Sequence, residues 1–326
     1  MYQVPAWACS LGMMRRMAAY SIGIDLGGTN LRAAAIDKDG KMLGKIAGST
    51  PLAEGPEPVV ADMVRAVESL RVQFGRDQLA GIAAGVPGNI DMAKGVIVGW
   101  GNMPVFNGYA MRDELSKRLG TKVILENDAN AAALGEQWMG AGRGVKDLVL
   151  LTLGTGIGGG IIIDGRILHG QIGMAGELGH ITISPNGNPC GCGNRGCVEK
   201  HASATAVSAM ARLLGLGPAL TAQQVHDLAA AGNDRAREIF RVMGEALGIA
   251  LASLINIFNF PLYLLGGGVV GAWEFFSPAM LAEVERRCFT YRSTLKTAPT
   301  RIEPAQLGSD AGLYGAACLP LQETAA

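Results

Sequence analysis

The chain has 326 residues, enough for two domains at about 150 residues each and too many for a small scaffold held by disulfides. Its 28 basic side chains balance 28 acidic ones, so no net field favours non-specific binding of nucleic acid or membranes, and any anionic ligand is held locally. The 47 glycines, about twice the usual share of ~7%, predict many tight turns, and the composition excludes a disordered chain.

The elements expected along the chain alternate between strands and helices. Residues 1–19 form an extension, because Arg15 and Arg16 follow its apolar part, which reverses the order of a secretory signal peptide. A strand, a glycine turn and a second strand occupy residues 20–37, ahead of an Asp-Gly hairpin signal at 39–40. The same plan returns at 148–163, ahead of Asp-Gly at 164–165. This repetition predicts a duplicated unit and two similarly built α/β domains that face each other across a cleft.

Further helices and strands are predicted between and after these units. Apolar spacing and flanking residues place helices at 58–74, 111–119, 129–138 and 234–256, and strands at 79–86, 122–125 and 262–265. Residues 246–273 carry no charge and exceed the ~20 residues that span a bilayer, but two asparagines, a proline and three consecutive glycines interrupt them. We interpret this stretch as a buried helix, a turn and a buried strand, and expect no membrane partner.

The glycine pattern at residues 154–159 matches the dinucleotide fingerprint G-x-G-x-x-G, with Glu177 beyond it. The fingerprint requires a helix to begin there, whereas this chain continues into an isoleucine-rich hairpin, so we reject a Rossmann site. A glycine turn in a hairpin can still direct backbone N–H groups at a phosphate. Thr155 and Gly156 are therefore candidate phosphate-binding residues.

A second glycine turn lies at the corresponding place in the first unit. It adds a carboxylate and a hydroxyl of the kind that a Mg²⁺-bound triphosphate needs, although a plain glycine hairpin explains this turn alone equally well. Three glycines after a buried strand strengthen the case for a nucleotide with Mg²⁺. The candidate residues of these two segments are Asp25, Gly27, Gly28, Thr29 and Asn30, and then Gly266, Gly267 and Gly268.

Three clustered cysteines and an upstream histidine indicate a metal site. His180, Cys190, Cys192 and Cys197 form a Cys₃His set, which fits a closed, structural Zn²⁺ site better than a disulfide or unligated core cysteines. The remaining cysteines are scattered, and a reducing cytoplasm is the simplest setting. Glu177 and Glu199 flank the cluster, where a zinc-bound imidazole could help position them for a substrate; the alternative is that both are solvated surface residues.

Asn127 and Asp128 follow the strand at 122–125 and begin the helix at 129–138. The carboxyl ends of parallel strands are where open α/β sheets bind ligands. Asp128 is also explained as a helix N-cap, a role compatible with catalysis.

Together these motifs resemble the ROK family (repressors, open reading frames and sugar kinases), in particular its glucokinase-like members, over residues 20–320. The segments that carry the resemblance are Asp25-Leu-Gly-Gly-Thr-Asn-Leu-Arg32, residues 153–160, residues 265–268, and the pattern from Glu177 to Glu199. The resemblance implies the actin-like sugar-kinase fold of two α/β domains with a cleft between them. We expect a small domain of residues 20–128 plus 310–326 and a large domain of residues 129–309 with the zinc loop 180–199.

The resemblance also implies ATP-dependent phosphorylation of glucose at its 6-hydroxyl to give glucose 6-phosphate. It makes Asp128 the general base, and a base with an ordinary aspartate pKa near ~3.9 suffices if it orients the attacking hydroxyl. It makes Asp25 a residue that helps hold Mg²⁺. The residues that it implies for sugar binding, besides Asp128, are Asn102, Asn127, Glu177, His180 and Glu199.

Three alternatives remain at this point. The sugar could be N-acetylglucosamine, N-acetylmannosamine or another hexose; the chain could be a non-catalytic sugar-sensing regulator; or it could be an actin-like ATPase. About 20 residues precede the first strand, too few for a DNA-binding domain, so we expect no nucleic-acid partner. The resemblance implies a homodimer or higher homo-oligomer in the cytoplasm.

Overall fold

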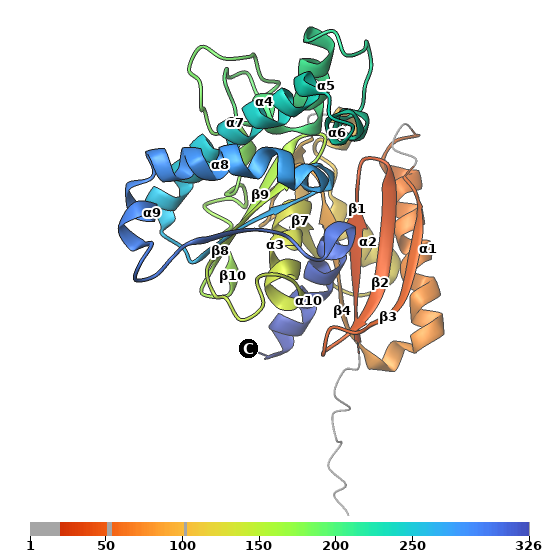
Figure 1. Ribbon diagram of the computed structural model, residues 1–326. Coiled ribbons are helices and arrows are strands. Elements are labelled where there is room, and N and C mark those ends of the chain that lie inside the picture. Colours follow the sequence, from red (N-terminus) through yellow and green to blue (C-terminus); the bar gives the residue numbers. More distant parts are fainter. Residues whose placement is uncertain (1–19, 51–53, 101–102, 326) are drawn as a thin grey trace, which may run out of the picture.

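The computed structural model describes residues 20–50, 54–100 and 103–325. Two five-stranded sheets dominate this described part, with the orders β3-β2-β1-β4-β7 and β10-β9-β8-β11-β12 (Figure 1). In both sheets the first strand of the unit pairs antiparallel with the second and parallel with a later strand. The duplicated unit predicted from the two hairpin signals is present as two sheets of matching topology.

The strands predicted at 20–37, 79–86, 122–125, 148–163 and 262–265 lie close to their predicted positions, whereas β12 was not predicted. The first sheet consists of β1 (Tyr20–Leu26), β2 (Asn30–Asp37), β3 (Met42–Ser49), β4 (Leu79–Val86) and β7 (Val123–Asn127). The second consists of β8 (Leu148–Leu153), β9 (Ile157–Ile163), β10 (Arg166–Ile167), β11 (Leu262–Gly266) and β12 (Arg301–Pro304). A small hairpin of β5 (Asn89–Asp91) and β6 (Val96–Gly99) follows β4.

The helices pack in layers on these sheets. The helices are α1 (Pro56–Phe74), α2 (Met111–Leu119), α3 (Asp128–Met139), α4 (Glu199–Ala202), α5 (Ala204–Leu213), α6 (Ala222–Ala230), α7 (Asp234–Phe258), α8 (Trp273–Arg287), α9 (Phe289–Thr294) and α10 (Ala311–Ala325). Short 3₁₀ turns are η2 (Arg76–Gln78), η3 (Pro104–Phe106), η4 (Leu178–His180), η5 (Gly268–Ala272) and η6 (Gly308–Asp310). Helices α1 and α2 cover the outer face of the first sheet, α3 and α10 lie between the sheets, and α7 covers the outer face of the second (Figure 1).

Side-chain alternation along the strands explains these layers. In β8, Leu148 and Leu150 join the core shared with α3 and α10, whereas Val149 and Leu151 join the core shared with α7. Successive side chains of a strand point to opposite faces, so a strand buried on both faces is apolar throughout. This is why the sequence shows continuous apolar runs at these strands.

The central helices α3 and α10 approach each other closely through glycine. A Cβ at Gly315 would overlap the carbonyl group of Ala131, and one at Gly135 would overlap that of Ala311. This close packing brings the C-terminal helix α10 back against β1 and β4 of the first sheet. The N-terminus of α3 is thereby fixed between the two sheets.

The uncharged stretch 246–273 divides as predicted into the end of α7, a turn and β11, followed by η5. Within the residues that the structure describes, no helix combines the length and apolarity needed to cross a membrane.

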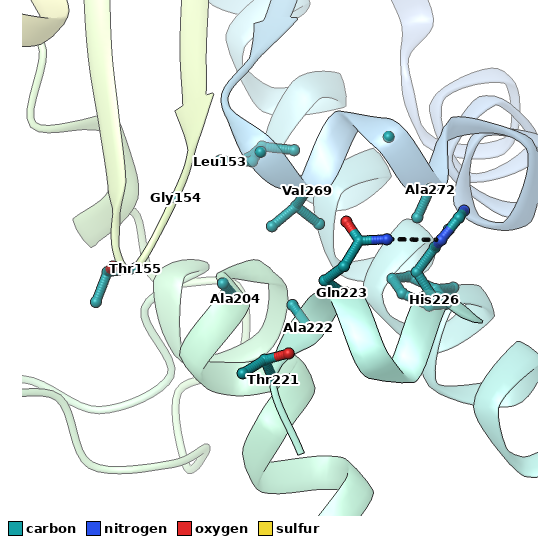
Figure 2. A pocket seen from close by; sticks show the side chains of 13 residues that line it. Leu153, Gly154, Thr155, Ala204, Thr221, Ala222, Gln223, His226, Val269 and Ala272 are labelled. Atoms are coloured by element: carbon teal, nitrogen blue, oxygen red, sulfur yellow. Dashed lines mark hydrogen bonds between the residues drawn. The ribbon is translucent and has the colours of Figure 1, made fainter. Parts of the chain in front are cut away.

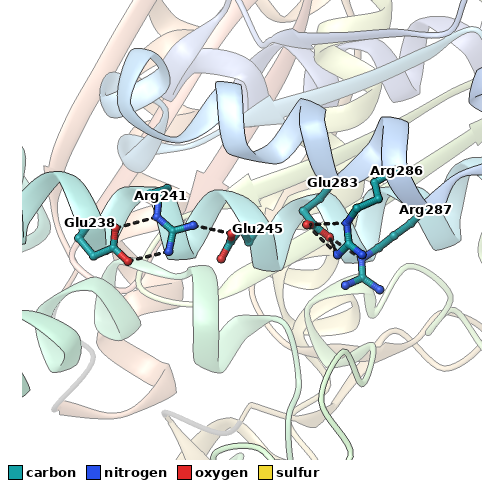
Figure 3. A network of polar contacts seen from close by, with 6 residues as sticks. All are labelled: Glu238, Arg241, Glu245, Glu283, Arg286 and Arg287. Atoms are coloured by element: carbon teal, nitrogen blue, oxygen red, sulfur yellow. Dashed lines mark hydrogen bonds and ion pairs between the residues drawn. The ribbon is translucent and has the colours of Figure 1, made fainter.

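The exposed faces of α7 and α8 carry ion pairs three or four residues apart along each helix (Figure 3). Such solvated pairs are worth about 0.3–0.5 kcal/mol each, so we assign this network to the surface and not to a binding site. Its members are Glu238, Arg241, Glu245, Glu283, Arg286 and Arg287.

Candidate active site

Asp128 is the first residue of α3 and directly follows β7. The N-cap of this helix is Asn127, whose Oδ1 accepts the N–H groups of Ala129 at 2.9 Å and Asn130 at 3.1 Å. An oxygen of Asp128 also accepts the Ala129 N–H, at 2.8 Å. The capping role considered for Asp128 thus belongs to Asn127, and the helix N-terminus fixes the Asp128 carboxylate in place.

Burial raises the pKa of Asp128 to about 6, and the nearby carboxylates of Asp25 and Glu177 add to the increase, while the Ala129 N–H opposes it. This pKa lies above the ordinary aspartate value near ~3.9, which would already suffice for the reaction. The sequence could not show this, because the shift depends on three segments that meet only in the fold. A carboxylate with this pKa is a stronger base than an ordinary aspartate and is still ionised at neutral pH.

Asp25 lies opposite Asp128 in a cavity of about 180 Å³ between the two sheets. Its walls include Asp25, Arg32, Asp128, Thr152, Gly266 and Gly267. Asp25 and Arg32 are direct partners in the β1–β2 ladder, and a guanidinium nitrogen of Arg32 lies 2.6 Å from the Asp25 carboxylate. Burial raises the pKa of Asp25, and the charge of Arg32 opposes that increase. The cavity wall thus carries three carboxylate residues, Asp25, Asp128 and Glu136, of which Asp25 is paired with a cation.

The first glycine turn lies beside this cavity and not in its wall. Gly28, Thr29 and Asn30 are exposed at the β1–β2 connection, where the Asn30 amide donates to the Thr29 hydroxyl at 3.0 Å. The Gly27 N–H donates to the carbonyl oxygen of Asn30 at 2.8 Å, which closes the turn. The turn therefore presents to solvent, next to Asp25, backbone groups and the Thr29 hydroxyl, which accepts from Asn30.

The second glycine turn is held by the segment that follows the cysteine cluster. Glu199 accepts the N–H of Ile157 at 3.1 Å, and a Cβ at Gly156 would lie 2.5 Å from the same carboxylate oxygen. The hydroxyl of Thr205 donates to the carbonyl of Thr155 at 2.7 Å. A side chain at 156 would therefore displace the Glu199 carboxylate from the N–H of Ile157.

The four predicted zinc ligands converge as expected. One ligand atom each from His180, Cys190, Cys192 and Cys197 lies within 4.8 Å of every other. The Cys192 and Cys197 sulfurs are 3.7 Å apart, and the Cys190 sulfur is 3.7 Å from His180 Nδ1. Tetrahedral zinc with Zn–S bonds of about 2.3 Å separates two sulfurs by about 3.8 Å, so this donor set fits the ion.

The imidazole of His180 connects the cysteine cluster to Glu177. Its Nδ1 faces Cys190, whereas its Nε2 lies 3.8 Å from a Glu177 carboxylate oxygen. Glu177 itself is exposed, and Glu199 is half-buried. Binding of a metal at Nδ1 would leave Nε2–H free to donate to a ligand beside Glu177.

Two further residues, Asn127 and Asn102, were predicted to bind the sugar, and the structure describes only the first of them. Asn127 lies next to Asp128, and its amide nitrogen donates to the carbonyl of Gly88 at 3.2 Å, so both ends of this side chain bond to the protein. Asn102 lies outside the described residues.

A larger cavity of about 340 Å³ lies on the other side of the glycines at 266–268 (Figure 2). Thr155 and Gly268, both predicted, lie in its wall, whereas Gly266 and Gly267 line the smaller cavity. Helix α6 and η5 complete it with Thr221, Gln223, His226, Val269 and Ala272. The Gln223 amide donates to His226 Nδ1 at 3.3 Å (Figure 2).

The sequence analysis did not identify the α6 residues that line this cavity. The only local signal is the capping box of Thr221 and Gln224, which marks the start of a helix and carries no information about a ligand. The cavity exists because α6 packs beside η5, although the end of α6 at residue 230 and the start of η5 at residue 268 are 38 positions apart in the chain.

Fold and site define this chain as a protein with the actin-like fold of sugar kinases, as predicted. It belongs to the ROK family, whose family model matches residues 21–323.

Relatives of known name match nearly the whole chain. A glucokinase of Thermotoga maritima is 37% identical over 91% of this chain and 96% of its own length. The crystal structure of a ROK hexokinase from Thermus thermophilus is 36% identical, has a TM-score of 0.80, and is matched over 94% of this chain and 99% of that one. A ROK family glucokinase from Streptomyces griseus, solved with glucose and AMPPNP, is 33% identical and has a TM-score of 0.74. The match covers 93% of this chain and 99% of that one.

Proposed function

We propose that this protein transfers the terminal phosphoryl group of ATP to the 6-hydroxyl of glucose, giving glucose 6-phosphate and ADP. The observation that carries this function is the convergence of Asp128, Asp25 and Glu177 from three segments at one end of the cleft. The named relatives are glucokinases and a hexokinase, which supports both the reaction and the sugar.

Glucose binds beside Glu177, His180 and Glu199, and Asn102 and Asn127 contribute further contacts to its hydroxyl groups. Glu177 is exposed next to a ring nitrogen of His180, so both groups are accessible to a ligand. Carboxylates and an imidazole N–H suit the many hydroxyl donors and acceptors of a sugar. In the proposed complex, the 6-hydroxyl lies within reach of Asp128.

Asp128 accepts the proton of the 6-hydroxyl as that oxygen attacks the γ-phosphorus of ATP. The new P–O bond forms on the sugar, the bond to the β-phosphate oxygen breaks, and ADP leaves with the electron pair. Phosphoryl transfer passes through a loose transition state, so the orientation of the hydroxyl contributes more than the strength of the base. The fixed position of Asp128 at the α3 N-terminus meets that requirement.

ATP lies across the glycine segments, with its base in the larger cavity and its phosphates toward the smaller one. Thr155 and Gly268 border the first, and Gly266 and Gly267 border the second. We propose that Gly156, beside Thr155 in the same turn, contacts the phosphates. Gly27, Gly28, Thr29 and Asn30 direct backbone and side-chain donors at the phosphates from the first sheet. Asp25 holds the Mg²⁺ that accompanies ATP, and this ion supplies charge neutralisation on the phosphates.

The Cys₃His set holds a structural Zn²⁺, supported by its tetrahedral spacing. The domain boundaries at 128–129 and 309–310 are supported by the positions of the two sheets. Residues 190, 192, 197, 288 and 318 are free cysteines, which supports a reducing cytoplasm. We further propose a homodimer or higher homo-oligomer, on the family resemblance alone.

The test of the function is ADP release from Mg-ATP across glucose, mannose, fructose, N-acetylglucosamine and N-acetylmannosamine. Glucose should give the highest kcat/KM, whereas 6-deoxyglucose, which lacks the acceptor hydroxyl, should inhibit without being phosphorylated. A higher kcat/KM for an amino sugar would transfer the proposal to that substrate. A rate that no sugar raises would refute a sugar kinase.

A further inference from the structure

His169 lies outside the residues assigned so far, at the start of the loop 168–176. This loop leads from β10 directly to Glu177. The His169 Nε2 atom lies 2.7 Å from a carboxylate oxygen of Glu126, although the two residues are 43 positions apart. The imidazole is 38% exposed, whereas the Glu126 side chain is 1% exposed. A buried carboxylate of the first sheet is thus bonded to a loop of the second half of the chain.

Glu126 also organises the segment that carries the proposed base. Its Oε1 accepts the N–H of Asn127 at 2.9 Å and the amide of Asn130 at 3.0 Å, and its Oε2 faces His169. Asp128 lies between these two asparagines in the chain. One carboxylate therefore bonds the β7–α3 junction with one oxygen and the loop 168–176 with the other.

The loop has further contacts along its length that make it a defined structure. The carbonyl of His169 accepts the N–H of Ala175 at 3.1 Å, which closes the loop, and the carbonyl of Ile172 accepts the N–H of Met92 at 3.3 Å. Gly176 has a φ of +97°, and a Cβ there would lie 2.8 Å from the carbonyl oxygen of Gly159. The loop is thus held by defined contacts at both ends, and it is the chain segment that joins His169 to Glu177.

We propose that His169 is a positioning residue, whose bond to Glu126 sets the distance between the sugar-binding Glu177 and the proposed base Asp128. This inference rests on the proposed sugar kinase function and adds to it a residue that does not touch the substrate. A misplacement of about 1 Å in a reacting group can cost about 100-fold in rate, so a remote bond of this kind has a measurable effect.

The bond is also sensitive to pH. Glu126 is the charged group that faces the imidazole among the described residues, and its hydrogen bond raises the pKa of His169, while burial opposes the increase. The ionic contact is complete at low pH and is lost as the pH rises through this raised pKa, after which a neutral imidazole can still donate from Nε2. We expect a shallow alkaline decline in kcat/KM for the sugar.

The experiment compares His169→Ala, His169→Gln and the loop control Gln171→Ala, an exposed neighbour. His169→Ala should lower kcat/KM for glucose by about 10- to 100-fold, with the KM for ATP changed less than twofold. His169→Gln, which keeps a donor without charge, should recover most of that loss and abolish the alkaline decline. Gln171→Ala should behave as the wild type.

The inference is overturned if His169→Ala keeps kcat/KM within twofold of the wild type, or if glutamine rescues nothing. A readout independent of activity is amide hydrogen exchange at residues 170–176, which should be faster in His169→Ala, with an unchanged melting temperature. Unchanged exchange would also overturn it. If the wild type phosphorylates no sugar, the kinase function is refuted. If exchange is nevertheless faster in His169→Ala, the bond from His169 to Glu126 still positions the loop 168–176.

Discussion

At the scale of single residues, the raised pKa of Asp128 determines how activity should depend on pH. The base must be ionised to accept a proton, and burial raises its pKa to about 6. We predict that kcat/KM for glucose falls as the pH drops through about 6, tenfold for each further unit. The measurement is a pH–rate profile from pH 4.5 to 9 at saturating Mg-ATP.

A profile that stays flat down to pH 4.5 would show that the base has an ordinary aspartate pKa, or that another group acts. His169→Gln is the matched control, because it should change the alkaline side of the profile and leave the acid side at about 6. Deprotonation of Asp128 raises activity whereas deprotonation of His169 lowers it, so their contributions appear on opposite sides of the profile and are separable.

The position of Asp128 at the junction of β7 and α3 was predictable from sequence, whereas its raised pKa was not. Its position after a strand and before an alanine-rich helix, within a family motif, is a local signal. The pKa depends on Asp25 and Glu177, which approach only after both sheets have packed. The bond from Glu199 to Ile157 and the pairing of His169 with Glu126 could not be predicted from sequence either, because their partners also meet only in the folded chain.

At the scale of elements, the cysteine loop and the second glycine turn form one unit. Glu199 follows the last ligand, Cys197, by two residues and bonds the N–H of Ile157 in the turn. Removal of the metal should therefore weaken the binding of both sugar and ATP. This coupling was not part of the sequence prediction, which assigned Glu199 to the sugar alone.

The substitution Cys192→Ser tests this unit. Cys192 is exposed, and without a metal its replacement by serine would change stability by less than about 0.5 kcal/mol. With zinc bound, we predict loss of metal, a melting temperature lower by several degrees, and higher KM values for glucose and ATP. The measurements are metal content by mass spectrometry, thermal unfolding and steady-state kinetics.

Cys318→Ser provides a second thiol variant, remote from the cluster, that should keep its full metal content. The purified wild type should contain one zinc per chain, and chelation followed by addition of Zn²⁺ should restore its kinetics. A metal-free wild type of full activity and unchanged stability would contradict a structural zinc.

At the scale of the whole molecule, the site lies where two sheets of the same topology face each other across α3 and α10 (Figure 1). The two hairpin signals and the apolar runs were sufficient to predict the duplication and the α/β class, because both depend on local pattern. The layer formed by α3 and α10 was not predictable, since it depends on contacts between Gly135 and Gly315. The larger cavity beside α6 likewise arises from packing.

The central claim is that Asp128 takes the proton from glucose during transfer, and the substitution Asp128→Asn tests it most directly. We predict a loss of about 10²–10⁴-fold in glucose-dependent ADP release, with a glucose Kd within threefold of the wild type by calorimetry. The melting temperature at pH 8 should not fall, because a carboxylate whose pKa is raised by folding destabilises the protein above that pKa. Turnover within tenfold of the wild type, with intact glucose binding, would contradict the account.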